Sequence, residues 1–220
     1  MDSKRTIRVT GKGRLKLKPD MTRITMTLKK VCPEYDEALR SSAESTAQLK
    51  ELFSGFGFKG SDLKTLSFDI DTEYESYRER GEYKERFAGY KYEHILKVEF
   101  DSDNGRLGKI LYALANSPLR PEFRISYTVK DEEKEKNRLL GNAVRDAMEK
   151  AGVLSAAAGV EPGEILSIDY SWGEIDFESR PVNRMMAGCC DNVMNSCCEL
   201  DIEPDDIDVS DTVTVIWEIR

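Results

Sequence analysis

The amino-acid sequence predicts an α+β fold in which helices pack on one face of a largely antiparallel sheet. Several segments alternate apolar and polar residues with a period of two, which is typical of half-buried strands. Between groups of these segments lie stretches whose apolar residues repeat at helical spacing. The predicted order of elements is ββαββαβαββ, and helices that recur between groups of strands favour the α+β class.

The first two predicted strands cover residues 7–18 and 23–29. In both, apolar side chains occupy one parity, and basic or hydroxyl-bearing side chains occupy the other. Pro19 and Asp20, which lie between them, are turn-forming residues. We therefore expect the two strands to form a long N-terminal hairpin.

A helix is predicted over residues 33–53, because its apolar residues fall on one face and a glycine-rich turn follows it. Strands are predicted at residues 66–74 and 90–100, where the alternation resumes. Residues 75–88 between these strands are rich in charged side chains. We expect them to form a charged connection.

The same period-two and helical patterns predict the elements of the second half of the chain. A short helix over residues 107–114 precedes a strand at residues 123–129. A long helix is predicted from residue 131 to about residue 158, with leucines and alanines on its inner face. Strands at residues 166–172 and 213–219 complete the predicted sheet.

Residues 174–211 show no regular periodicity, and we expect them to form a mobile loop. A chain of 220 residues is long enough for one large domain or two small ones. We expect one domain over residues 1–220 that includes this loop.

The composition narrows the possible partners and location. The 33 basic residues are outnumbered by 41 acidic residues, and a net charge of −8 disfavours binding to nucleic acid or to anionic membranes. No apolar segment follows the N-terminal charges as in a signal peptide, and no apolar run is long enough to insert into a membrane. We therefore expect a cytoplasmic protein whose five cysteines remain thiols.

Short motifs along the chain resemble those of the SIMPL domain family. They are IRVTGKG at residues 7–13, KPD at 18–20, GYKY at 89–92, the alanine-rich helix at 136–151, GVEPGEILSI at 159–168 and DTVTV at 211–215. Taken together, the resemblance covers residues 7–172 and 209–220.

The resemblance implies a relationship to bacterial SIMPL-like proteins of unknown function. Such proteins are similar to periplasmic immunogens and membrane-associated bacterial proteins that can assemble into large oligomers, and to a eukaryotic kinase-interacting protein. It supplies no catalytic residues for this chain. The sequence differs from the family pattern in its cysteine-bearing loop and in the absence of a recognisable export signal.

The cysteine cluster is the candidate site for metal or redox chemistry. It consists of Cys189, Cys190, Cys197 and Cys198. Four thiolates could bind Zn²⁺, and thiolates with nearby methionines could bind Cu(I), but the spacing matches no familiar zinc motif. Redox-labile thiols, or a loop whose cysteines have no role, are the alternatives. We predict no bound cofactor.

Three other features are weaker candidates for a functional site. Residues 55–60 read GFGFKG, but a helix precedes them and a strand follows, which is the reverse of a dinucleotide-binding loop, so a helix-ending turn is expected. His94 is the only histidine, and any catalytic arrangement with an imidazole base would require it. Since it lies on the apolar parity of a strand, we expect a buried, hydrogen-bonded histidine. The acidic residues at 199–211 lack the pattern of a calcium loop and are expected to be solvated.

The basic parity of the predicted hairpin is the most asymmetric feature of the sequence. It consists of Arg8, Lys12, Arg14, Lys16, Lys18, Arg23 and Lys29. A solvated outer face whose lysines protect an edge strand is one interpretation. The other is an electrostatic docking surface for the acidic loop of a second copy or for another anionic partner.

These observations favour a non-catalytic interaction or scaffolding protein that self-associates as a homo-oligomer, and not an enzyme. A metal- or redox-responsive protein that acts through the four loop cysteines is the alternative. A third possibility is an enzyme that uses His94.

Overall fold

The computed structural model describes residues 5–79, 81–170, 175–179 and 203–220. Its elements are β1 (Thr6–Leu17), β2 (Met21–Cys32), α1 (Tyr35–Ser54), β3 (Lys64–Glu79), β4 (Glu82–Asp101), α2 (Asn104–Asn116), β5 (Glu122–Thr128), α3 (Glu132–Ala157), β6 (Pro162–Tyr170) and β7 (Ile207–Ile219). The predicted α+β class and the predicted order of elements are confirmed. Strand β7 begins within the segment that was predicted to be a loop, and most of the remaining loop lies outside the described residues.

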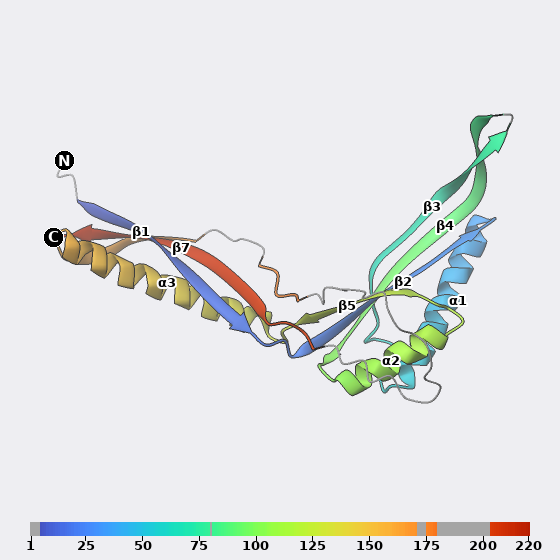
Figure 1. Cartoon of the computed structure of the whole chain (residues 1–220), viewed down its shortest axis with the longest axis horizontal. Helices are drawn as coiled ribbons and strands as arrows, with labels where there is room; N and C mark the ends of the chain where they lie inside the picture. Colours follow the sequence, from blue (N-terminus) through green and yellow to red (C-terminus); the bar gives the residue numbers. More distant parts are fainter. Residues whose placement is uncertain (1–4, 80, 171–174, 180–202) are drawn as a thin grey trace. The chain divides into compact units, whose positions relative to one another are not determined.

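The strands form two sheets, and the chain divides into two compact units (Figure 1). The first unit contains residues 1–20, 128–179 and 205–220, and residues 21–127 form the main part of the second. The three-stranded sheet, in the order β1-β7-β6, belongs to the first unit. The four-stranded sheet, in the order β3-β4-β2-β5, belongs to the second.

The predicted N-terminal hairpin is wrong. Strand β1 pairs with β7 in antiparallel register, so that Gly11 lies opposite Val213, whereas β2 pairs with β4. At the predicted turn, the backbone N–H of Asp20 donates to the carbonyl of Thr128, and the Asp20 carboxylate accepts from the N–H of Lys130. Alternation predicted the buried face of each strand, but it carries no information on which strand lies beside it.

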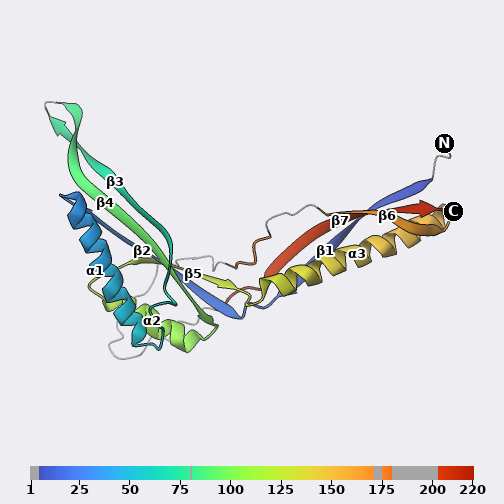
Figure 2. The same ribbon diagram turned by 180° about the vertical axis from the view of Figure 1, so that it is seen from behind.

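Helix α3 packs on one face of the three-stranded sheet (Figure 2). Its inner side presents the fully buried Ala143, Ala147 and Ala151 to Val9, Val213 and Trp217 of the sheet. Small residues on the helix let its axis approach the strands closely. The opposite face of this sheet carries no helix among the described elements, and we call it the open face.

Two glycines of β1 make this close approach possible. A Cβ atom added at Gly11 would lie 2.0 Å from the carbonyl oxygen of Ala143, and one added at Gly13 would lie 2.2 Å from that of Leu139. Any larger residue would push the helix backbone away from the sheet. The two glycines are therefore required by packing, although they lie within a strand, where glycine is otherwise unfavourable.

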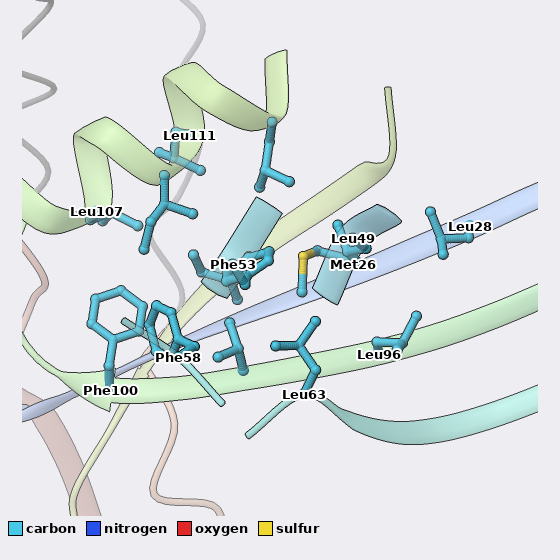
Figure 3. Packing of buried hydrophobic residues seen from close by; sticks show 14 of the residues in the cluster. Met26, Leu28, Leu49, Phe53, Phe58, Leu63, Leu96, Phe100, Leu107 and Leu111 are labelled. Carbon is cyan, nitrogen blue, oxygen red and sulfur yellow. The ribbon is translucent and has the colours of Figure 1, made fainter. Parts of the chain in front are cut away.

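The core of the second unit lies between the four-stranded sheet and the helices α1 and α2 (Figure 3). Met26 of β2 and Leu96 of β4 meet Leu49 and Phe53 of α1, and Leu107 of α2 belongs to the same cluster. Each of these side chains is almost fully removed from water. At about 25 cal/mol per Å² of apolar surface, such burial is the main favourable term in the folding of this unit.

The charged connection predicted at residues 75–88 is instead a continuation of β3 and β4 as a two-stranded ribbon. The rings of Tyr74 and Phe87 meet edge to face with their centroids 5.8 Å apart. Lys84 pairs with Glu79 at 2.6 Å, and Arg86 pairs with Glu75. The charges that indicated a loop are thus matched across the ribbon, which sequence order alone did not reveal.

We predict that Gly11→Ala destabilises the protein by about 3 kcal/mol, because the new methyl group overlaps backbone atoms of α3 that have no room to move. Chemical denaturation followed by circular dichroism measures the change. Gly141→Ala is the matched control, since a Cβ at this position of α3 meets nothing within 4 Å. That variant should be neutral or more stable by up to about 1 kcal/mol. Equal stability of the two variants would contradict the close contact.

Candidate interaction surfaces

The packing of α3 determines the direction of the β1 side chains. Odd-numbered residues such as Val9 face the helix, so Arg8, Lys12 and Arg14 extend from the open face of the three-stranded sheet, where all three are exposed. We call these three residues the cation row. In the middle of this face, the hydroxyls of Thr10 and Thr214 lie 2.8 Å apart.

The seven predicted cations do not share one sheet. Arg8, Lys12, Arg14 and Lys16 belong to β1, and Lys18 follows it, whereas Arg23 and Lys29 lie on β2 in the four-stranded sheet. The proposed role of these residues in binding is not tested by their positions. Their separation into two sheets follows directly from the absence of the predicted hairpin.

Three of these cations already have partners within the chain. Lys16 lies 3.5 Å from a carboxylate oxygen of Asp206, Arg23 bonds Glu99 at 2.6 Å, and Lys29 pairs with Glu122. Burial alone would raise the pKa of Glu99, but hydrogen bonds from Arg23 and Lys97 outweigh it and hold that pKa below its ordinary value. The charge of Arg23 is therefore balanced by Glu99, so Arg23 is poorly suited to attract an anionic partner.

The cation row forms no such ion pair with described residues, although the charge of Arg14 helps to lower the pKa of Asp146. Within the described part of the chain, no carboxylate lies within ion-pair distance of the side chains of Arg8, Lys12 or Arg14. Acidic side chains are spread along the same open face. Glu218 lies opposite Thr6 near Arg8, Asp169 of β6 lies opposite Thr214 in the middle, and Asp208 lies opposite Lys16 near the other end.

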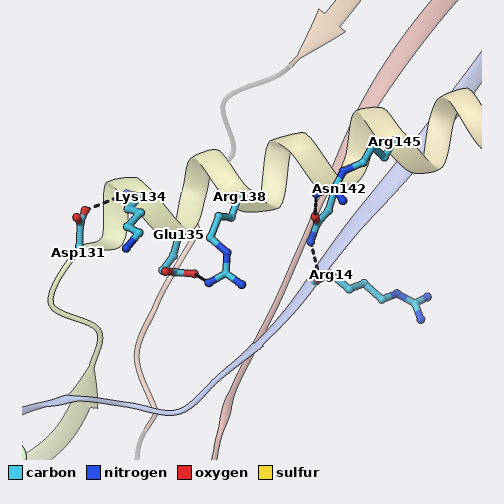
Figure 4. Close-up of polar contacts among 7 residues, drawn as sticks. All are labelled: Arg14, Asp131, Lys134, Glu135, Arg138, Asn142 and Arg145. Carbon is cyan, nitrogen blue, oxygen red and sulfur yellow. Dashed lines mark hydrogen bonds and ion pairs between the residues drawn. The ribbon is translucent and has the colours of Figure 1, made fainter.

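The free edge of β1 is capped by side chains of α3. The Lys12 N–H donates to the Asp146 carboxylate at 2.6 Å, and the Asn142 side-chain amide donates to the carbonyl of Arg14 at 3.2 Å (Figure 4). The Lys150 ammonium group lies 3.5 Å from the Thr10 carbonyl and 2.7 Å from Asp146. We call Asn142, Asp146 and Lys150 the capping ladder.

The capping ladder acts as a substitute for a neighbouring strand. Its members are spaced at i, i+4 and i+8, so they lie on one side of α3 and meet successive backbone groups of β1. Hydrogen bonds from Lys150 and from the Lys12 N–H hold the pKa of Asp146 below its ordinary value, so this carboxyl remains charged near neutral pH. An edge whose backbone groups are occupied in this way does not accept another strand.

The outer surface of α3 near its N-terminus is a weaker candidate. A shallow hollow there is lined by Lys134, Arg138 and Arg145, among others. Arg138 bonds Glu135 at 2.5 Å, and Arg145 donates to the Asn142 side chain at 2.6 Å (Figure 4). Arg138 and Arg145 thus bond other side chains of α3. The cation row is therefore the stronger candidate for binding an anionic partner.

His94 is half-buried and hydrogen-bonded on both sides of its ring. Its Nδ1 lies 3.1 Å from the hydroxyl of Thr46 and 3.3 Å from that of Ser42, and its Nε2 lies 2.8 Å from that of Thr65. Burial, with a smaller contribution from Lys50, lowers its pKa. The predicted hydrogen bonding is confirmed, although the ring is less buried than expected. Among the residues that the structure describes, no carboxylate bonds the ring, as a catalytic triad would require.

The structure describes some of the remaining candidate residues, and others lie outside the described part of the chain. Residues Gly55 and Gly57 form the turn after α1, as expected, with Gly57 at φ 83°. The cysteines Cys189, Cys190, Cys197 and Cys198 lie outside the described residues, as does the middle of the predicted loop. Among the residues that the structure describes, no three His, Cys, Asp or Glu side chains are grouped so that they could hold a metal ion. Likewise, no described helix is both long and apolar enough to span a bilayer.

Comparison with known proteins places the chain in a family. The model of the SIMPL family, described as a protein of unknown function (DUF541), matches residues 7–217. The chain belongs to the SIMPL family. The resemblance predicted from short motifs is therefore confirmed, and the match spans both compact units.

One curated relative is a 26 kDa periplasmic immunogenic protein of Brucella abortus (strain S19). It is 25% identical over 163 residues, which is 74% of this chain and 65% of the relative, so the match spans slightly less than two thirds of the relative's length. The prediction of a cytoplasmic protein is contradicted by this relationship and is wrong. The expectation that the cysteines remain thiols depended on that location and loses its basis. The family description names no enzymatic activity, and a non-catalytic role stays a prediction.

We predict that Asp146→Ala speeds hydrogen exchange at the Lys12 amide by about tenfold or more, because the N–H loses its acceptor and becomes accessible to water. Exchange measured residue by residue with NMR tests this. Glu149→Ala, an exposed change on the same helix, is the control and should leave that amide unaffected. Unchanged exchange in Asp146→Ala would show that the capping ladder does not protect the edge.

We predict that His94→Gln lowers the free energy of unfolding by about 1 kcal/mol through loss of ring hydrogen bonds. Because the folded protein lowers the pKa of His94, the stabilisation from the neutral ring is present above the ordinary value of 6.5 and is lost as pH falls through the folded pKa. The difference between wild type and variant should therefore narrow at acidic pH. Urea denaturation above and below pH 6.5 measures it, and a constant difference would contradict this role.

Proposed function

We propose that the chain is a non-catalytic interaction or scaffolding module that self-associates and acts in the periplasm. The location is carried over from the printed name of the Brucella relative. The observation that carries the self-association is the cation row along the open face, which forms no ion pair with described residues, together with the carboxylate of Asp208 near one end of that face.

This charge distribution is self-complementary. Arg8 lies opposite Ile216 near one end of the β1–β7 pair, and Lys16 lies opposite Asp208 near the other. When two copies meet face to face across a two-fold axis, Arg8 of each copy faces Asp208 of the other. Both contacts form at once, so the pairing satisfies two sets of charges with one arrangement.

The surroundings of the face favour a solvated, electrostatic contact over an apolar one. Among the charged side chains lie hydroxyl groups, including those of Thr10, Ser210, Thr212 and Thr214, and the carboxylate of Asp169 lies opposite Thr214. Such a surface keeps a monomer soluble and forms bridged or direct polar contacts when it docks. Association of this kind weakens with salt, because mobile ions screen charges over about 8 Å at physiological ionic strength.

We predict that the protein self-associates at low salt and dissociates as salt rises. Replacement of Arg8, Lys12 and Arg14 by Glu should weaken association by at least about tenfold, because each contact becomes repulsive, while the exposed positions leave the fold intact. Sedimentation velocity at two salt concentrations measures both effects.

The matched control replaces Lys59, Lys109 and Arg124 by Glu, which changes the net charge equally at exposed sites in the second unit. This control should associate almost as the wild type does. Equal loss of association in both triple variants would indicate a general effect of net charge. A monomer at low salt would contradict self-association altogether.

A further inference from the structure

We propose that β3 is an acceptor edge that binds an extended partner segment in which basic residues alternate with apolar ones. The site is separate from the open face of the three-stranded sheet, and the proposal goes beyond self-association. The bound segment would add to the four-stranded sheet as a further strand, through backbone hydrogen bonds along β3.

The edge of β3 is long and uncapped in the part of the chain that the structure describes. The strand has 16 residues, none of which is buried, and it is the outermost strand of its sheet. No described side chain bonds the backbone of this strand, in contrast to the capping ladder that occupies the edge of β1. A free edge presents alternate N–H and C=O groups that pair readily with another extended chain.

The side chains of β3 define what can bind there. On the side that faces α1, Phe68 and Ile70 lie opposite His94 and Tyr92, and Phe68 is 42% exposed. Tyr74, which is 57% exposed, extends this apolar row through ring contacts that run by way of Phe87 and Tyr90 to Tyr35 of α1. Helix α1 contacts β2 and β4, so it leaves the apolar side of β3 partly uncovered.

The other side of β3 carries the carboxylates Asp69, Asp71 and Glu73. Glu73 lies 3.8 Å from Lys91, whereas Asp69 and Asp71 form no ion pair with any described residue. In the β3–β4 register, Asp69 lies opposite Glu93, which concentrates negative charge at that position, whereas Asp71 lies opposite Lys91. A segment added beside β3 would therefore be stabilised by lysine or arginine on this side and by apolar residues on the other.

A second copy of β3 does not satisfy these requirements. Two identical antiparallel strands related by a two-fold axis place the same face of each strand together, so the carboxylates of one copy would oppose those of the other. This repulsion protects the edge against pairing with itself while leaving it open to a cationic segment. Strand β1 has the required alternation, but its own edge is occupied by the capping ladder.

The test uses the full chain and a short synthetic peptide of alternating lysine and valine as the probe. Fluorescence anisotropy should show binding, and hydrogen exchange should show new protection of the β3 amides. The same peptide N-methylated at alternate residues keeps its charge but lacks strand donors, and it should not bind. A block peptide with the same composition, in which lysines and valines are segregated, should bind at least about tenfold more weakly.

Asp69→Lys combined with Asp71→Lys should weaken binding of the alternating peptide by about tenfold, since both changes remove an attraction and add a repulsion. Glu149→Lys combined with Glu161→Lys is the charge-matched control at exposed positions in the first unit and should bind as the wild type does. Equal binding of the alternating and block peptides, protection outside β3, or an effect of the control pair equal to that of the β3 pair would overturn the proposal. None of these measurements involves the cation row, so their outcome does not test the proposed self-association.

Discussion

The close contact between α3 and the backbone of β1 is the constraint on which the candidate surface of the first unit depends. Gly11 and Gly13 remove the side chains that would separate helix from strand, and the alanines of α3 complete the fit. This approach brings Asn142, Asp146 and Lys150 within bonding distance of the strand edge. It also assigns one parity of β1 to the helix, so the basic parity has only the open face to occupy. One packing contact thus caps an edge and exposes a row of cations.

Two of the outer strands, β1 and β3, differ in how their edges are protected from pairing with other chains. The backbone groups of an edge strand bind other chains unless something occupies or guards them. On β1, the capping ladder occupies them with side-chain partners. On β3, no described side chain bonds the backbone of the strand, and we propose that Asp69 and Asp71 repel chains of similar charge. The first arrangement favours contact through a face, and the second favours contact through an edge.

Burial of a strand residue follows from the local sequence pattern, whereas the pairing of strands depends on residues that are far apart in the chain. Alternation predicted most strands and their inward residues, because it reports burial, which is local to each strand. It could not show that β1 pairs with β7, some 200 residues away, and the predicted hairpin with β2 was wrong for that reason. The ribbon beyond Tyr74 was missed because its charges are neutralised across strands by pairs such as Lys84 and Glu79.

The candidate surface was predictable in part. The sequence placed basic residues on one parity of β1, and the structure agrees, but it could not show that Lys16 and Arg23 are already paired, since those contacts depend on register. A further signal was available: glycines at alternate positions of a strand, together with alanines four residues apart on a helix, indicate close packing of the two. That signal would have pointed to the contact between β1 and α3.

The most direct test of the central claim is a complementation experiment with two charge-reversed proteins, followed by native mass spectrometry. One carries Glu in place of Arg8, Lys12 and Arg14, and the other carries Lys in place of Asp208. Each should be monomeric alone, because both contacts across the two-fold axis become repulsive. Mixed in equal amounts, they should form a one-to-one complex, because native cations meet native carboxylates at one contact and reversed charges meet at the other. A mixture that remains monomeric, under conditions in which the wild type associates, would contradict docking through the open face.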